Sequence, residues 1–171
     1  MTLNSLRDVL TESVRDLYST ETQLVKALPR MAKAAASPEL KGVFTEHLTE
    51  TKEQVKRLEQ VCVLLGVKPK GKTCHAMKGL IAEGAEIIAA RGEPAAKDAA
   101  LIAAAQKIEH YEIAGYGAVR TFASVLGEDE VAELLQATLD EESAADENLT
   151  AIAEGVVNLD AAGEEDGDAD E

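Results

Sequence analysis

The stretch that decides the fold is residues 99–126, which read AALIAAAQKIEHYEIAGYGAVRTFASVL. Its abundance of Ala, Leu and Ile at helical spacing predicts one long α-helix. At about 100° per residue, Glu109 and Glu112 fall on the same side of this helix as Leu101 and Tyr116, which is the apolar side. A helix that only had to fold would carry Leu or Ala at these positions. The sequence therefore raises the question of why two carboxylates point into the core.

The whole chain has the composition of a single helical domain. Of its 171 residues, 46% are hydrophobic but only 3% are aromatic, and there is no Trp. Strong helix formers dominate, and no segment alternates Val, Ile, Thr or Tyr with polar residues as a strand would. We expect an all-α domain over residues 1–157, followed by an acidic tail over residues 158–171.

The charge distribution narrows the possible partners. The formal net charge is −15, and residues 160–171 (DAAGEEDGDADE) contain only acidic charges, so the tail is predicted to be disordered. Such acidity argues against binding to nucleic acid or to an anionic membrane surface. The two cysteines form no disulfide framework, and neither a signal peptide pattern nor an apolar run of about 18 residues is present. We therefore expect a cytoplasmic protein with reduced thiols.

Hydrophobic periodicity predicts four long helices and a short one, at about residues 2–36, 37–65, 73–90, 94–126 and 128–154. Ser37 and Pro38 form a helix-start signal, Thr73 is a candidate cap for the short helix, and Pro29 is expected to kink the first helix. The short helix lies between two pairs of long ones and gives the chain length to cross between two antiparallel hairpins. This order is typical of four-helix bundles with one long crossover.

Every long helix places at least one acidic or imidazole side chain on its apolar face or at the edge of that face. These residues are Glu21 on the first; His47 and Glu50 on the second; Glu109 and Glu112 on the third; and Glu142 and Asp146 on the fourth. The amide side chain of Gln54 lies on the same face of the second helix as His47. Buried carboxylates are costly when isolated, and several together repel one another by several kcal/mol at low dielectric. Shared protons or basic partners would relieve this repulsion, but no Lys or Arg occupies a comparable position. Bound cations are the better explanation.

The ligand types restrict which cations fit. Carboxylates with at most one His suit hard or borderline ions such as Mn, Fe, Mg or Ca. Carboxylates on facing helices of a bundle are the design of di-iron and di-manganese proteins. Bridging Glu residues from the first and third long helices, with terminal ligands from the other two, would hold two Fe or Mn ions close together. Such a site can react with O2 or peroxide.

Several stretches resemble one known family. They include LYSTETQLVKALPRMAKAAASPELK, EHLTETKEQVKRLEQV, CHAMKGLIAEG, DAALIAAAQKIEHYEIAGYGAVR and LLQATLDEESAADENLTAIAE, and together they cover about residues 3–154. The chain resembles the YciF-like stress proteins of bacteria. The resemblance implies a ferritin-like four-helix bundle with a short fifth helix, a homodimer, a role in stress responses and a rubrerythrin-like metal centre. The metal ligands that it implies are Glu21, Glu50, Glu109, Glu112 and Glu142, with His47, Gln54 and Asp146 as further candidates.

The sequence departs from the general ferritin pattern, which has Glu-x-x-His on the second and fourth long helices. The corresponding positions here read Thr51-x-x-Gln54 and Glu142-x-x-Ala145, so both histidines are missing. A standard ferroxidase centre is therefore not expected. Two functions remain open: a di-metal protein that oxidises Fe(II) or consumes peroxide or O2, and a non-catalytic dimeric stress protein whose bundle is a binding or oligomerisation module without functional metal. Iron storage is a third option, but the sequence does not reveal the multi-subunit shell that storage requires.

Overall fold

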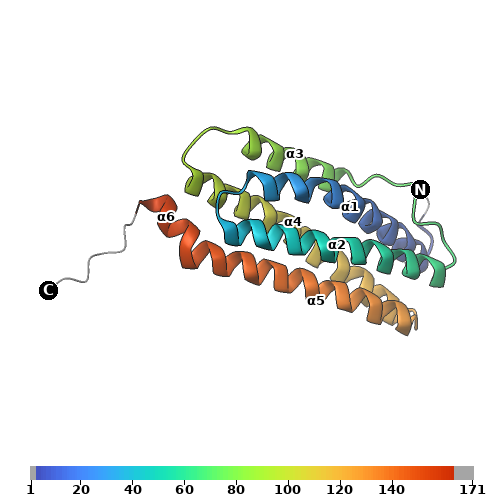
Figure 1. Cartoon of the computed structure of the whole chain (residues 1–171). Helices are drawn as coiled ribbons and strands as arrows, with labels where there is room; N and C mark the ends of the chain where they lie inside the picture. The colour runs from blue at the N-terminus through green and yellow to red at the C-terminus, as the bar shows by residue number, and fades with distance from the viewer. Residues whose placement is uncertain (1–2, 164–171) are drawn as a thin grey trace.

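The structure is a computed structural model that describes residues 3–163 of the chain. Its elements are α1 (Leu6–Ala34), α2 (Pro38–Leu64), α3 (His75–Ala89), α4 (Pro94–Val125), α5 (Asp129–Ile152), a π-helical turn (Ala153–Val157) and α6 (Asn158–Ala162). The four long helices lie side by side, with α1 packed on α2, α4 on α5, α2 on α5 and α1 on α4 (Figure 1). The short α3 lies against α1 and α4 and belongs to the crossover. The predicted all-α bundle with one long crossover is confirmed.

Local capping determines where the helices begin. The Ser5 side chain accepts a hydrogen bond from the Asp8 amide (3.1 Å), so α1 starts at Leu6 and not at the predicted residue 2. Ser37 caps α2, with Pro38 at the first helical position, as predicted. The cap of α3 is Cys74 and not Thr73, because the Cys74 Sγ accepts from a backbone amide in the first turn of the helix.

The helical region also extends further toward the C-terminus than predicted. The sequence placed the last helix end near residue 154 and the start of the tail at residue 158, but residues 158–162 form α6. Val157, which is 3% exposed, packs with Ala153 in the apolar core and keeps the chain against the bundle. Gly163 then adopts a left-handed conformation and ends the helix. Residues 164–171, the remainder of the predicted tail, lie outside the described residues.

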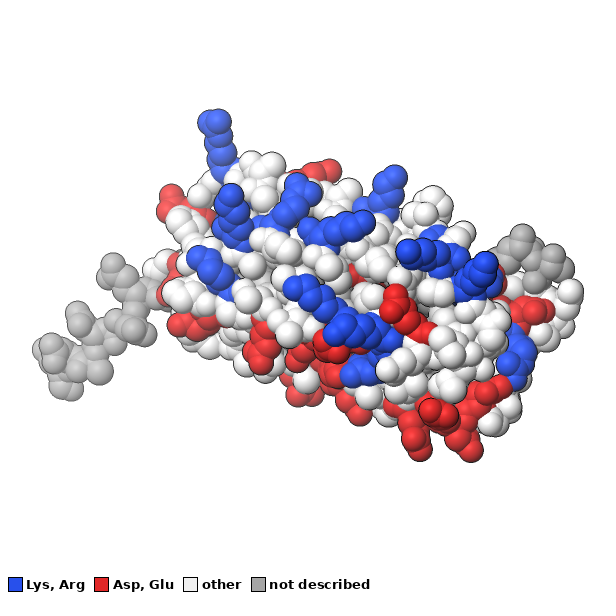
Figure 2. All heavy atoms as spheres, turned by 45° about the vertical axis from the view of Figure 1, so that its right-hand side comes forward, with Lys and Arg blue, Asp and Glu red and all other residues white. Residues whose placement is uncertain are grey.

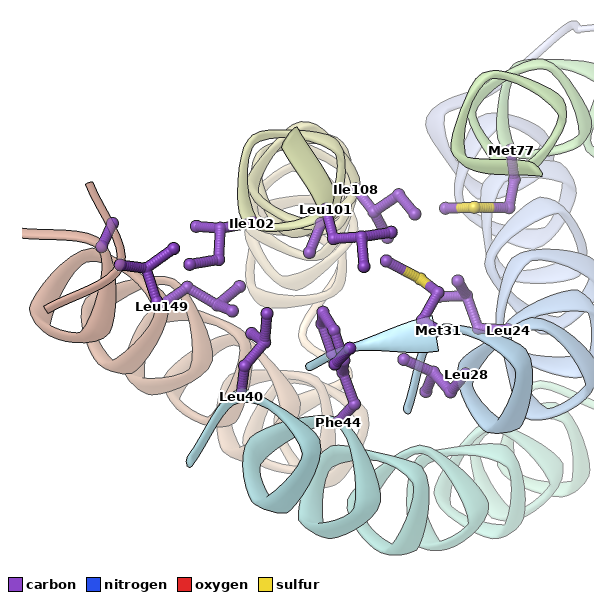
Figure 3. Close-up of a cluster of buried hydrophobic side chains, with 14 of the residues drawn as sticks. Leu24, Leu28, Met31, Leu40, Phe44, Met77, Leu101, Ile102, Ile108 and Leu149 are labelled. Carbon is purple, nitrogen blue, oxygen red and sulfur yellow. The ribbon is translucent and has the colours of Figure 1, made fainter. Parts of the chain in front are cut away.

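Two apolar clusters fill the bundle, one toward each end. The first apolar cluster includes Leu24, Leu28, Met31, Phe44, Leu101 and Leu149, whose side chains converge from four helices (Figure 3). The second apolar cluster includes Leu10, Val14, Leu58, Tyr116, Val119 and Leu135. Along each long helix, buried polar residues fall between members of these two clusters, as Glu21 does between Leu17 and Leu24; Asp98, near the start of α4, is a buried acid outside this region. A polar layer therefore divides the core.

The surface charge is distributed unevenly. Lys and Arg gather over the upper part of the molecule in Figure 2, whereas Asp and Glu line its lower edge, where α5 lies in Figure 1. Helix α5 contains several Asp and Glu but no Lys or Arg. No helix between residues 3 and 163 combines the length and apolarity that a membrane crossing requires.

Candidate metal centre

Four buried side chains meet in the polar layer. His47 from α2, Glu109 and Glu112 from α4, and Glu142 from α5 each offer a ligand atom, and these atoms lie within 4.8 Å of one another. The His47 Nε2 is 3.5 Å from the Glu109 Oε1 and 3.7 Å from the Glu142 Oε2. Ligands bound to one ion at about 2.0–2.6 Å are separated by similar distances. The four groups are therefore spaced as a metal site requires.

Glu21 contributes the carboxylate of α1, the remaining long helix. It is fully buried, and its Oε1 accepts a hydrogen bond from the Tyr116 hydroxyl. Burial, and next the charge of Glu142, raise the pKa of Glu21 from its ordinary value of 4.5 to about 8. Together, Glu21, His47, Glu109, Glu112 and Glu142 form what we call the carboxylate layer. As predicted from helical periodicity, these side chains face the interior from all four long helices.

Most carboxylate oxygens of the carboxylate layer have no hydrogen-bond partner. Within residues 3–163, the buried carboxylate oxygens that have no hydrogen-bond partner are Glu21 Oε2, Glu109 Oε2, both oxygens of Glu112 and both oxygens of Glu142. The nearby Gln54 Oε1 is also buried and unpartnered. Each buried acceptor without a partner costs about 1–3 kcal/mol. The protein atoms alone therefore do not stabilise this layer.

Electrostatics in the layer favour either protons or cations. Burial is the main cause that raises the pKa of Glu112, and the charges of Glu21 and Glu142 add to it. Burial also raises the pKa of Glu109 and Glu142. For His47, burial acts to lower the pKa, but Glu109, Glu50 and Glu142 outweigh it and raise the pKa to about 10. These shifts favour protonated forms of His47 and of the buried carboxyl groups, and a bound cation would compete with those protons.

Two of the predicted carboxylate ligands lie outside the layer. The Glu50 side chain is 41% exposed at the rim, with its Oε2 3.4 Å from the His47 Nδ1. The Asp146 Oδ2 lies 3.4 Å from the Nε2 of the exposed His110, and the Gln106 amide donates to Asp146. The buried positions of α5 after Glu142 are Ala145, one turn beyond it, and Leu149, two turns beyond it, so the structure does not bring Asp146 to the layer.

The sequence analysis missed an ion pair at the edge of the layer. Arg57 on α2 donates two hydrogen bonds to Glu141 on α5, both 2.8 Å long, and the Gln54 Nε2 donates to the same carboxylate (3.0 Å). These contacts fix the position of Glu141 and balance its charge at the edge of the layer. A search for Lys and Arg on the apolar faces does not find this pair, because Arg57 lies at the rim of α2 and its long side chain extends to Glu141.

Comparisons with known proteins agree with this structure. The domain family described as "Domain of unknown function (DUF892)" matches residues 5–162. Protein YciF of Escherichia coli (strain K12) is 44% identical over 159 residues, which cover 92% of this chain and 96% of YciF.

Solved structures show similarity to the same group of proteins. The crystal structure of the E. coli stress protein YciF superposes with a TM-score of 0.88 at 44% identity, covering 91% of this chain and 99% of that one. YcfI from Rhodopseudomonas palustris, proposed to be a structural protein, superposes with a TM-score of 0.84 at 41% identity, covering 86% and 94%. The chain therefore belongs to the DUF892 family of YciF-like proteins.

Proposed function

We propose that the carboxylate layer binds two divalent metal ions, iron or manganese, and that the protein serves in stress responses by oxidising Fe(II) or consuming peroxide or O2. The observation that carries this proposal is the set of buried carboxylate oxygens without partners in the carboxylate layer. These oxygens come from α1, α4 and α5, helices that are otherwise packed with apolar side chains. Burying carboxylates in such a core costs free energy of folding unless a positive charge neutralises them.

The residues present fit such ions. Carboxylate oxygens with one imidazole suit iron and manganese, which when bound would supply redox chemistry with O2 or peroxide. Glu109, Glu112, Glu142 and His47 would hold the ions, and Glu21, which accepts a hydrogen bond from the Tyr116 hydroxyl, would add a further carboxylate. The two apolar clusters limit access of water from both ends of the layer. The missing Glu-x-x-His motifs distinguish this ligand set from that of a standard ferroxidase centre.

The proposed role in stress responses is based on similarity to relatives of this chain. E. coli YciF is described as a stress protein, and the high coverage of both chains supports extending that role to this protein. We include a cytoplasmic location and a homodimer in the proposal. Both described cysteines, Cys62 and Cys74, are unpaired, as a reducing compartment would require. Sedimentation analysis of the purified chain would test the dimer.

One observation favours the alternative function, a non-catalytic binding or oligomerisation module. The charges around His47 raise its pKa to about 10, so an imidazolium could balance one carboxylate while protons neutralise others. The similarity to YcfI, proposed to be a structural protein, fits this alternative as well. In that case, Glu21→Gln and Glu112→Gln would leave the function in stressed cells unchanged.

Metal analysis separates the two functions. The protein is purified from cells grown with iron or manganese, its metal content is measured, and Fe(II) oxidation is followed by stopped-flow absorbance. A Glu109→Ala/Glu142→Ala variant is compared with Glu130→Ala/Glu133→Ala, which removes two exposed carboxylates of α5. We expect the wild type and the exposed-site control to retain metal and oxidise Fe(II), and the layer variant to do neither. If the wild type retains neither metal, and the layer variant is the more stable protein whatever metal is added, the proposal fails.

A further inference from the structure

A buried metal site needs an entry path, and one cavity of the structure meets the layer directly. This cavity has a volume of about 60 Å³ and lies between α2 and α5. The residues of its wall that matter here are Glu46, His47, Glu50, Glu141 and Ala144. Only His47 belongs both to this wall and to the carboxylate layer, so it marks the place where the two meet.

His47 connects the outside of the bundle with the inside. Its Nδ1 lies 3.4 Å from the Glu50 Oε2 at the rim. Its Nε2, on the other edge of the ring, lies 3.5 Å from Glu109 and 3.7 Å from Glu142 in the layer. An ion moving from Glu50 past the imidazole would meet the unpartnered oxygens of Glu142 next. The same ring can therefore contact an ion on either side.

The carboxylates of the cavity have different roles. Glu141 is held by Arg57 and Gln54, so its charge is balanced and its position fixed. Glu46 and Glu50 are one helical turn apart on α2, and within residues 3–163 neither forms an ion pair with a Lys or Arg. These two carboxylates can capture a cation, whereas Glu141 forms part of the wall.

We infer that the cavity between α2 and α5 is the route by which divalent metal ions enter the carboxylate layer, with Glu46 and Glu50 as the capture site and His47 at the inner end. This inference rests on the proposed metal binding. The surface around the cavity supports it, because α5 carries no basic residue and acidic side chains line this edge of the molecule (Figure 2). Clustered charge of one sign raises the local concentration of counter-ions and their association rate.

The experiment measures how fast metal binds. Metal-free protein is mixed in a stopped-flow instrument with Mn(II) and a fluorescent indicator that reports free Mn(II). Glu46→Gln removes a capture charge, and Ala144→Leu narrows the cavity without changing charge. Their matched controls are Glu133→Gln and Ala137→Leu, both at exposed positions of α5, with Ala137 about two turns before Ala144. Glu50 is left intact, because the resemblance implies it as a ligand and its substitution would mix capture with binding.

We expect Glu46→Gln and Ala144→Leu to slow Mn(II) association by about fivefold or more, at the scale of electrostatic steering, while the controls bind at the wild-type rate. The amount of Mn(II) bound at equilibrium should be the same in all five proteins. If both cavity variants bind as fast as their controls while the wild type still binds Mn(II), only the entry route is refuted. If the wild type binds no Mn(II) at equilibrium, the proposed metal site fails and the route with it.

Discussion

Asp98, in the first turns of α4, and Glu112, near the middle of the same helix, are both buried, but their surroundings differ. Asp98 accepts hydrogen bonds from the backbone amides of Ala36 (2.9 and 3.1 Å) and Ser37 (2.6 Å). Neither oxygen of Glu112 has a hydrogen-bond partner. Burial of a carboxylate therefore does not by itself indicate a binding site. What marks the carboxylate layer is burial without donors.

The two regions also differ in what they do for the fold. Asp98 ties the turn between α1 and α2 to α4, so its charge stabilises a connection that the helices alone would leave loose. Glu112 lies among Glu21, Glu109 and Glu142, whose charges raise its pKa further after burial has done so. One carboxylate strengthens the native state of the metal-free chain, and the other weakens it. The following substitutions test that contrast.

The largest expected effect is the loss of Asp98. Asp98→Ala would leave two buried backbone amides without an acceptor, at about 1–3 kcal/mol each, so we expect the free energy of unfolding to fall by about 3 kcal/mol. Urea denaturation followed by circular dichroism measures it. Glu147→Ala, which removes an exposed carboxylate, is the control and should change stability little. Equal effects of the two substitutions would contradict the role given to Asp98.

Glu112→Gln should change the free energy of unfolding in the opposite direction to Asp98→Ala. In metal-free protein we expect it to raise the free energy of unfolding by about 2 kcal/mol, because a neutral amide removes a carboxylate that burial and like charges destabilise. The new amide can also donate to Glu21. The measurement is urea denaturation in the presence of a chelator. A loss of stability similar to that of Asp98→Ala would show that Glu112 is stabilised by contacts of the protein alone.

The pH dependence of stability tests how the buried groups of the carboxylate layer affect the metal-free fold. The folded pKa values of Glu21 (about 8) and His47 (about 10) lie above their ordinary values of 4.5 and 6.5. For a group whose pKa is raised by folding, the unfolded state loses its proton first as the pH rises, so the stabilisation disappears toward the folded pKa. We expect metal-free protein to lose stability progressively between about pH 5 and pH 10. Denaturation at several pH values with chelator checks this, and rising stability over that range would contradict it.

The smallest expected effect concerns Tyr116. Tyr116→Phe removes the one hydroxyl that donates to Glu21, and we expect a loss of about 1 kcal/mol. Tyr111→Phe is the control, because the Tyr111 hydroxyl donates to Asp16 (2.9 Å) outside the layer. Only Tyr116→Phe should alter how stability depends on pH above neutrality. Identical pH profiles for the two variants would show that Tyr116 does not act on Glu21.

Helical periodicity correctly predicted that the four acids of the carboxylate layer face the core. A period of 3.6 residues places Glu21, Glu109, Glu112 and Glu142 among apolar neighbours, and the structure buries all four. The same pattern also predicted that Asp146 faces the core. Asp146 does not reach the carboxylate layer, because Ala145 and Leu149 occupy the buried positions of this part of α5. Whether any of these side chains binds metal stays a prediction.

Contacts between segments far apart in the sequence could not be predicted in this way. Asp98 lies on the core side of α4, but its partners are amides in a turn about sixty residues earlier, which no local pattern identifies. The pairing of Arg57 with Glu141 depends likewise on the side-by-side packing of α2 and α5. The extension of the helical region to residue 162 depends on burial of Val157 against the bundle, although Gly155 resembles a helix end.

The most direct test of the carboxylate layer as a cation site is anomalous diffraction from crystals of the protein grown with Mn(II). We expect two anomalous peaks within the layer, in contact with carboxylates of Glu109, Glu112 and Glu142 and near Glu21 and His47. Absence of any peak there, with these carboxylates bonded to one another through protons or to water, would contradict the central claim.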